Sequence, residues 1–334
     1  QQSSMASLTA KTCSAGAAVH QQARTTQRVV SLRPASVKTA ARSVATSAVA
    51  TPTKEQWKLG VHAPTEKVNH AGLPQLISKE QVVSLEAMLD QGSSIAALRR
   101  FNDNLRALPA DSWESALRPV FAEMTYNLES FNPAFASCLL MVQRTLGHSD
   151  YVRRDMALKN LIQPLAGEYG MNNNQPQLKT HRELFSEFYT SLFHSPLEEL
   201  VAGSARPAAA ELLWSQMNRD IMGGGGAVQA PMEQASYALG YNLAIEYLAD
   251  YEKTWMLDSF RDMSDRYMAA QGRKINWVFL EVHAEGEAEH AAIGHAAVLN
   301  FVPAEHVPIM QQAMKDHDRD FAVFYNRMAD MLAQ

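Results

Sequence analysis

The chain has 334 residues, of which 30 are basic and 35 acidic, and it contains two cysteines. So few cysteines exclude a disulfide-stapled scaffold. Cys138 lies in an apolar run that predicts a buried core position rather than a disulfide or a thiolate site. No stretch of about 18 consecutive apolar residues is present, so we expect no transmembrane helix.

The first 54 residues differ in composition from the rest of the chain. They contain seven Lys or Arg residues and no Asp or Glu, among many Ser, Thr and Ala. This composition predicts a disordered organelle transit peptide, and the Met5-Ala-Ser opening favours a chloroplast over a mitochondrion; a merely disordered tail is the alternative. Its removal leaves 23 basic against 35 acidic residues, a formal charge of −12. That charge argues against nucleic acid or an anionic membrane as a partner.

Residues 55–334 have the composition of an all-α protein. Ala, Leu, Met, Glu and Gln dominate, apolar residues recur at spacings of three and four, and alternating strand patterns are hard to find. We expect an N-terminal helical extension over residues 55–130, packed on an all-α domain over residues 131–334. The predicted helices are Lys79–Gln91, Ser94–Leu105, Ser112–Ser130, Asn132–Leu146, Ser149–Tyr169, Lys179–Leu192, Ala208–Asp220, Pro231–Asp265, Lys274–Val302 and Pro308–Ala333.

The strongest functional signal lies in the helix predicted over residues 274–302. His283, Glu287 and His290 stand at i, i+4 and i+7, which places them within an arc of roughly 60° on one helix face. Apolar residues share this face, and the other acidic residues of the stretch lie elsewhere. A solvated helix face is the alternative. Polar groups on an apolar face need partners, so the pattern favours half of a metal site.

A helical dimetal centre needs further carboxylates and histidines from facing helices. Glu246 is an isolated acid in a mostly apolar turn, with an exposed position on an amphipathic helix as the alternative. Glu168 ends one predicted helix. His181 begins the next, on the same face as Leu184, Phe185 and Phe188. Glu246, Glu168 and His181 are the candidates for the other half of the site.

These residues carry a family resemblance that spans roughly residues 130–305. His283-x3-Glu287-x2-His290 resembles the three-ligand motif of the haem-oxygenase-like dimetal-carboxylate oxidases and oxygenases. These all-α proteins share the scaffold of haem oxygenase and thiaminase II. Glu246, in Ala-Leu-Gly-Tyr-Asn-Leu-Ala-Ile-Glu, is similar to the single glutamate of the family's middle helix.

The first half of the family motif is matched less closely. Glu168-Tyr-Gly170 and His181-Arg-Glu-Leu-Phe185 resemble the family's first ligand pair, with the Asn172-Asn-Asn174 loop as an apparent insertion between them. The middle ligand of the last helix is Glu287, where the family more often has Asp.

The resemblance implies a haem-oxygenase-like helical bundle that holds two ferrous ions, or manganese in one position, through Glu168, His181, Glu246, His283, Glu287 and His290. It implies activation of O2 to oxidise a small acid or amine by N-oxygenation, oxidative C–C cleavage, desaturation or decarboxylation. An external electron donor and a homodimer fit this interpretation.

Other interpretations remain open. One is a metal-free thiaminase-like or PqqC-like enzyme, which needs a catalytic cysteine or another set of histidines. Another is a non-catalytic plastid binding or assembly protein. A ferritin-like carrier usually needs two Glu-x-x-His motifs on separate helices, and Glu287-x-x-His290 is the convincing one here.

Overall fold

The computed structural model describes residues 73–172, 175–176, 179–202, 207–223 and 230–334, and the side chains of 172, 175–176 and 285–292 lie outside that description. The chain divides into two units, Gln1–Thr51 and Pro52–Gln334, and all of the described helices belong to the second. The predicted transit peptide lies outside the described residues. Among those residues, no helix combines the length and hydropathy that crossing a bilayer requires.

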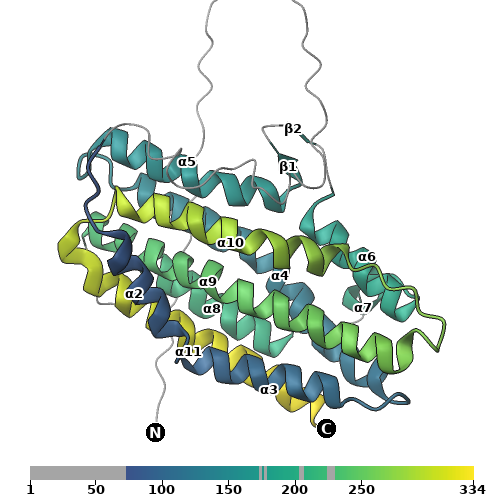
Figure 1. The fold of residues 1–334 in the computed structure, drawn as a ribbon. Helices are drawn as coiled ribbons and strands as arrows, with labels where there is room; N and C mark the ends of the chain where they lie inside the picture. The colour runs from purple at the N-terminus through teal and green to yellow at the C-terminus, as the bar shows by residue number, and fades with distance from the viewer. Residues whose placement is uncertain (1–72, 173–174, 177–178, 203–206, 224–229) are drawn as a thin grey trace, which may run out of the picture. The chain divides into compact units, whose positions relative to one another are not determined.

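The all-α prediction is confirmed (Figure 1). Two paired two-residue strands, β1 (Met171–Asn172) and β2 (Gln175–Pro176), accompany the helices, and a π-helical turn over Ser264–Met268 ends α9. The helices are α2 (Lys79–Leu89), α3 (Ser93–Ala107), α4 (Trp113–Gln143), α5 (Tyr151–Glu168), α6 (His181–Phe193), α7 (Leu197–Ala202), α8 (Ala208–Ile221), α9 (Pro231–Met263), α10 (Val278–Leu299) and α11 (Val307–Leu332), with a 3₁₀ turn at Ala304–His306.

The predicted break near residue 131 is wrong. α4 runs without interruption through Pro133, although an interior proline removes one helical hydrogen bond. Ala134, Phe135 and Cys138 are buried just beyond it, so tertiary packing holds the helix together. The predicted boundary between extension and domain therefore falls inside one helix. The short helix α7 was not predicted, because it offers too few residues for a periodic pattern.

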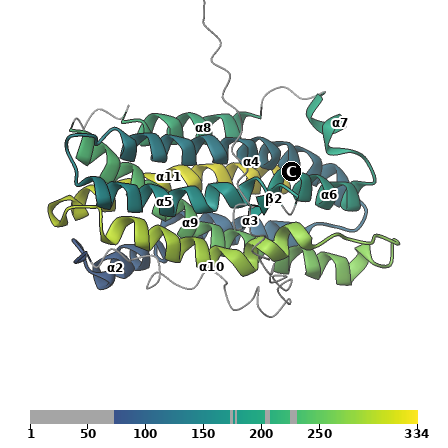
Figure 2. The same ribbon diagram turned by 90° about the horizontal axis from the view of Figure 1, so that it is seen from above.

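α9 lies at the centre of the bundle, between α10 on one side and α3 and α11 on the other, with α4 and α8 behind it (Figures 1 and 2). Every residue from 235 to 246 is buried. A helix that is buried all round has no solvent face. Each polar group that this stretch of α9 carries must therefore find its partner within the protein.

The backbones of α9 and α11 approach each other closely at Gly240. A Cβ atom at this position would lie 2.7 Å from the Cα atom and 2.8 Å from the carbonyl oxygen of Met310. No real Cβ contact is that short, and the obstructing atoms are backbone. A glycine is therefore required here for the two helix backbones to pass each other.

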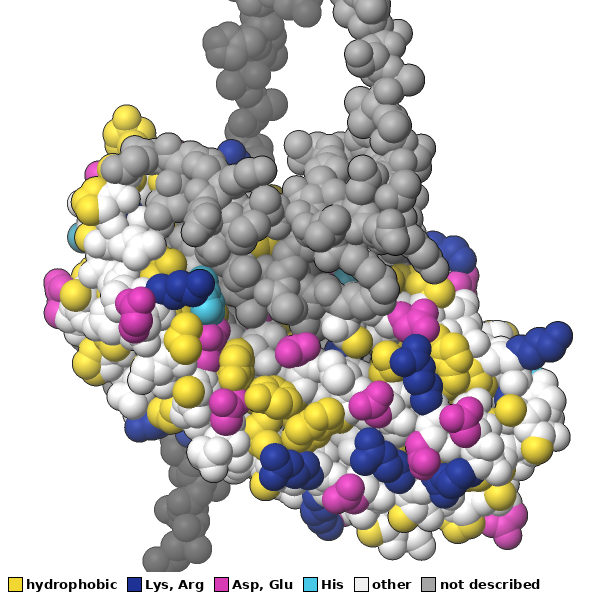
Figure 3. Space-filling model, in the orientation of Figure 1, with side chains coloured by type: hydrophobic (Ala, Val, Ile, Leu, Met, Phe, Trp, Pro, Cys, Tyr) yellow, Lys and Arg dark blue, Asp and Glu magenta, His cyan; other side chains and the backbone are white. Residues whose placement is uncertain are grey.

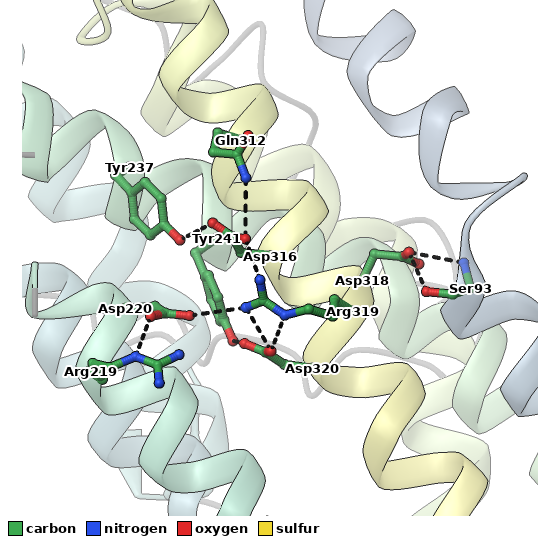
Figure 4. A network of polar contacts seen from close by, with 10 residues as sticks. All are labelled: Ser93, Arg219, Asp220, Tyr237, Tyr241, Gln312, Asp316, Asp318, Arg319 and Asp320. Carbon is green, nitrogen blue, oxygen red and sulfur yellow. Dashed lines mark hydrogen bonds and ion pairs between the residues drawn. The ribbon is translucent and has the colours of Figure 1, made fainter. Parts of the chain in front are cut away.

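A polar network joins α8, α9 and α11 (Figure 4). The Tyr237 hydroxyl donates to Asp316 at 2.7 Å and the Tyr241 hydroxyl donates to Asp320 at 3.2 Å. Arg319 pairs with Asp316 and Asp320. Burial is the main cause that raises the pKa of Asp320 to about 6, against the opposing effect of Arg319. The network supplies partners for two tyrosines of the buried central helix.

Two helices receive their N-terminal caps from distant carboxylates. Asp318 of α11 accepts the backbone N–H groups of Ser93 and Ser94 at the start of α3, both at 2.9 Å. Glu123 of α4 accepts those of Ala209 and Ala210 at the start of α8, at 3.1 and 2.6 Å. Neither helix has a local side-chain cap, so these contacts satisfy otherwise orphaned donors.

The solvent side of the bundle has a mixed character. On the face drawn in Figure 3, described Lys and Arg side chains are interspersed with Asp and Glu, and apolar side chains lie among them. Exposed ion pairs such as Arg261 with Glu281, at 2.8 Å between Nη2 and Oε1, join neighbouring helices. Such exposed pairs contribute little to stability, so the buried contacts decide the fold.

We expect Gly240→Ala to destabilise the protein by about 1–3 kcal/mol, because the added methyl forces α9 and α11 apart. Gly167→Ala is the matched control, since a Cβ atom at this α5 position would meet nothing within 4 Å. The control should leave stability unchanged or raise it slightly. Urea denaturation of the two variants measures the difference, and equal stabilities would contradict the close approach.

We expect Asp318→Asn to lower stability by about 0.5–2 kcal/mol at pH 7. Burial opposes ionisation of Asp318, but the hydrogen bonds from Ser94 and Ser93 outweigh it and lower its pKa. A lowered folded-state pKa stabilises above the unfolded value of about 3.9 and loses that contribution as pH falls through the folded value. The deficit of the variant should therefore shrink below about pH 4. The exposed Asp258→Asn on α9 should show no such pH-dependent deficit.

Candidate metal centre

Three helices bring Glu168, His181 and His283 together. Glu168 is the last residue of α5. His181 is the first residue of α6, whose start is set by a capping box between Thr180 and Glu183. His283 lies in the second turn of α10. The end of α5 lies close to the beginning of α6, because Glu168 and His181 are in contact.

The ligand atoms of these three residues converge. One nitrogen or oxygen atom from each lies within 4.8 Å of the others. The imidazole rings of His181 and His283 have centroids 4.3 Å apart. Glu168 and His283 are buried and His181 is half-buried. A carboxylate and two imidazoles at such spacing form a donor set that a divalent transition metal accepts.

The contact between Glu168 and His181 is close but poorly aligned for a hydrogen bond. His181 Nδ1 lies 2.9 Å from Glu168 Oε1, yet this nitrogen makes no hydrogen bond of acceptable geometry within the described residues. A nitrogen and an oxygen atom that lie close together without hydrogen-bond alignment are typical of metal ligands, because both atoms then point at the same ion. The arrangement therefore fits a metal between them.

A backbone contact determines the tautomer of His283. Its Nδ1 lies 2.6 Å from the carbonyl oxygen of Phe279, one turn earlier on α10. Because a carbonyl only accepts, the proton stands on Nδ1 and the lone pair on Nε2. Metal-binding histidines commonly donate their second ring N–H in this way, which fixes the orientation of the ring.

Glu246 is buried, with 1 % of its surface exposed, so the alternative of an exposed amphipathic position is wrong. It lies on α9, which faces α10. Its charge contributes to the raised pKa of Cys138 on α4. Glu246 does not belong to the group of three whose ligand atoms lie within 4.8 Å.

The predicted ligands Glu287 and His290 have side chains outside the described residues. The α10 backbone is helical through both positions, so the helical spacing on which the prediction depended is present. Their ligand role stays a prediction.

A cavity of about 60 Å³ reaches the buried ligands, and Glu168 and His283 form part of its wall. Much of the remaining wall is apolar. Three ionisable side chains that sequence reasoning missed also line it, namely Glu252, Lys253 and His317. Their sequence surroundings are rich in charge, which is typical of a solvated face. The signal that could have identified His317 is its spacing from Met310, Met314 and Phe321, which places it on the apolar face of α11.

Glu252 is a buried carboxylate with two partners. The Tyr325 hydroxyl donates to it, and Lys253 Nζ lies 3.0 Å from its Oε1 atom. Lys253 also lies over the ring of Phe279, with 5.9 Å between Nζ and the ring centroid. A positive charge is therefore held at the cavity wall, close to the helix turn that carries His283.

Cys138 is buried, as predicted. Burial is the main cause that raises the pKa of its thiol to about 12, and the charge of Glu246 adds to it. A thiol with so high a pKa is almost fully protonated at neutral pH, so it is a poor nucleophile.

Comparisons with known proteins leave the family undetermined. No family model and no curated protein sequence matches the chain. A solved structure of a CADD-like protein of unknown function from Nostoc punctiforme is similar, with 15% sequence identity and a TM-score of 0.46. The similarity covers 71% of this chain and 97% of that one. The function of this chain must therefore be inferred from its own residues.

We expect Cys138 to react with a thiol reagent at pH 8 at least a hundredfold more slowly in the folded protein than in denaturant, because the thiol is buried and protonated. The predicted transit segment contains the other cysteine, so the assay uses Cys13→Ser in an otherwise full-length chain. Fast stoichiometric labelling of the folded variant would contradict the burial.

Proposed function

We propose that this protein is a non-haem dimetal oxidase or oxygenase that uses O2 to oxidise a small acid or amine. The observation that carries the proposal is the convergence of Glu168, His181 and His283 from three helices. Glu168 and His283 also line a cavity. The basic, acid-free composition of residues 1–54 supports a plastid location as part of the same proposal.

The donor set suits iron. Mixed carboxylate and imidazole ligands are typical of ferrous sites that react with O2. Glu168, His181 and His283 would hold one side of the centre. The family resemblance assigns Glu246, Glu287 and His290 to the rest, and two irons, or one iron with manganese, would complete it. When bound, the metals would supply the redox chemistry that side chains alone lack.

The chain's own groups would bind and orient the substrate. Apolar residues such as Phe185 and Phe279 line the cavity beside the ligands and limit access of water. Lys253 holds a positive charge at the same wall, where it would attract the carboxylate of a small acid. Glu252, which partners Lys253, would instead attract the amine of a basic substrate.

The metal-free thiaminase-like or PqqC-like alternative has less support. A cysteine-based mechanism needs an accessible thiolate, whereas Cys138 is buried and its pKa is raised to about 12. A non-catalytic binding or assembly role would be consistent with the fold but leaves the converging ligand atoms unexplained.

We expect the protein, loaded anaerobically with ferrous iron and desalted, to retain about two irons per chain and to consume O2. His283→Ala and His181→Ala should each retain no more than about one iron and lose O2 consumption, because each removes a ligand. His148→Ala, which changes an exposed histidine, is the matched control and should behave as wild type.

Iron content measured by elemental analysis and O2 uptake measured with an electrode test this proposal. Retention of the same iron by His283→Ala as by wild type would contradict the ligand assignment. No retained metal in the wild type would favour the non-catalytic alternative.

A further inference from the structure

His317 is a buried histidine that the candidate metal centre does not use. It lies on α11, has 1 % of its surface exposed, and lines the same cavity as Glu168 and His283. Neither ring nitrogen has a hydrogen-bond partner among the described residues. Burial lowers its pKa to about 3, so the imidazole is neutral, with one N–H donor and one lone pair to offer.

The packing around His317 holds the ring in one orientation. Its ring stands edge-on to Tyr241, with centroids 4.8 Å apart, and tilted against Phe321 at 5.3 Å. The hydroxyl of Tyr241 is itself held by Asp320 (Figure 4). A polar group that is pre-oriented in this way loses little entropy when it binds a ligand.

An unsatisfied polar group in a protein interior destabilises the fold. Each unpaired buried donor or acceptor costs about 1–3 kcal/mol, and an apolar side chain of similar shape would avoid this cost. A histidine that contributed only packing would therefore be a poor choice at this position. A ligand that hydrogen-bonds to the ring would account for it.

We propose that the cavity binds a substrate through a neutral hydrogen-bonding group, a hydroxyl, carbonyl or amide, that pairs with the imidazole of His317 while an apolar body lies along the walls. The identification of this ligand as the substrate rests on the proposed function, but the binding itself needs no metal. A charged group would bind less favourably beside His317, because a neutral imidazole supplies no countercharge. The positive charge at the cavity wall belongs to a different residue, Lys253.

The cavity of about 60 Å³ is smaller than the roughly 150 Å³ that holds a benzene ring in an engineered protein cavity. Met124 and Met217 are part of its wall. Methionine side chains are flexible and adapt to a ligand, so an aromatic probe can enter when they move. Their methyl groups then report on binding.

The test compares phenol with toluene, which differ by one hydroxyl group, on the metal-free full-length chain. Binding is followed by the NMR shifts of ¹³C-labelled methionine methyl groups. We expect the phenol-to-toluene affinity ratio to fall about fivefold in His317→Phe, the size expected for one neutral hydrogen bond. Phe131→Leu is the matched control, because it changes only the apolar wall and should leave the ratio unaltered.

His317→Met repeats the test should the phenylalanine variant misfold. In the absence of ligand, at least one of the two variants should be as stable as wild type or more stable, because both remove unpaired polar atoms. An unchanged ratio in both variants, or shifts absent with both probes, would overturn the proposal. So would a loss of stability in both variants without a change of ratio, which indicates a structural histidine.

Iron retention by the wild type without a change of the affinity ratio in the variants would overturn this inference and leave the dimetal function standing.

Discussion

Burial of much of α9, on all sides over residues 235–246, is the constraint on which the rest of this structure depends. The helix carries tyrosines, serines and two glutamates into the interior, and burying such groups unpaired is costly. Other helices supply the partners: Asp316 and Asp320 for two tyrosines, Tyr325 for Glu252 and Asn102 for Ser259. The arrangement of the helices around α9 therefore depends on these hydrogen bonds as well as on apolar packing.

The candidate metal centre follows from the same arrangement. α10 packs along α9, while α5 and α6 meet α10 from the outer side. Glu168 at the C-terminal end of α5 and His181 at the N-terminal end of α6 therefore lie beside His283 of α10. Because these ligands lie at helix ends, their position depends on where each helix stops, which the capping box at Thr180 sets for α6. Rigid elements hold ligands more accurately than loops do.

The cavity combines features that serve binding better than stability. Glu252 and Lys253 form an ion pair at its wall, and His317 is buried without a hydrogen-bond partner among the described residues. Replacing buried charged pairs by well-packed apolar side chains is often neutral or stabilising in proteins. The presence of the ion pair and of His317 beside Glu168 and His283 supports the proposal that this part of the core binds a ligand. On another side of α9, at Gly240, the tight packing against α11 serves the stability of the fold.

Local patterns in the sequence determined the helices themselves. Apolar periodicity predicted most of the helices and indicated correctly that Cys138 is buried. It made Glu168 and His181 candidates, and the family resemblance placed them in one site with His283, which the structure bears out by bringing the three side chains together. Local patterns could not show that α4 continues through Pro133, because tertiary packing compensates for the lost hydrogen bond. Nor could they show the caps that Asp318 and Glu123 provide from distant helices, or the cavity position of His317, hidden among charged neighbours. These features arise from contacts between residues far apart in the chain, which only the tertiary structure brings within reach.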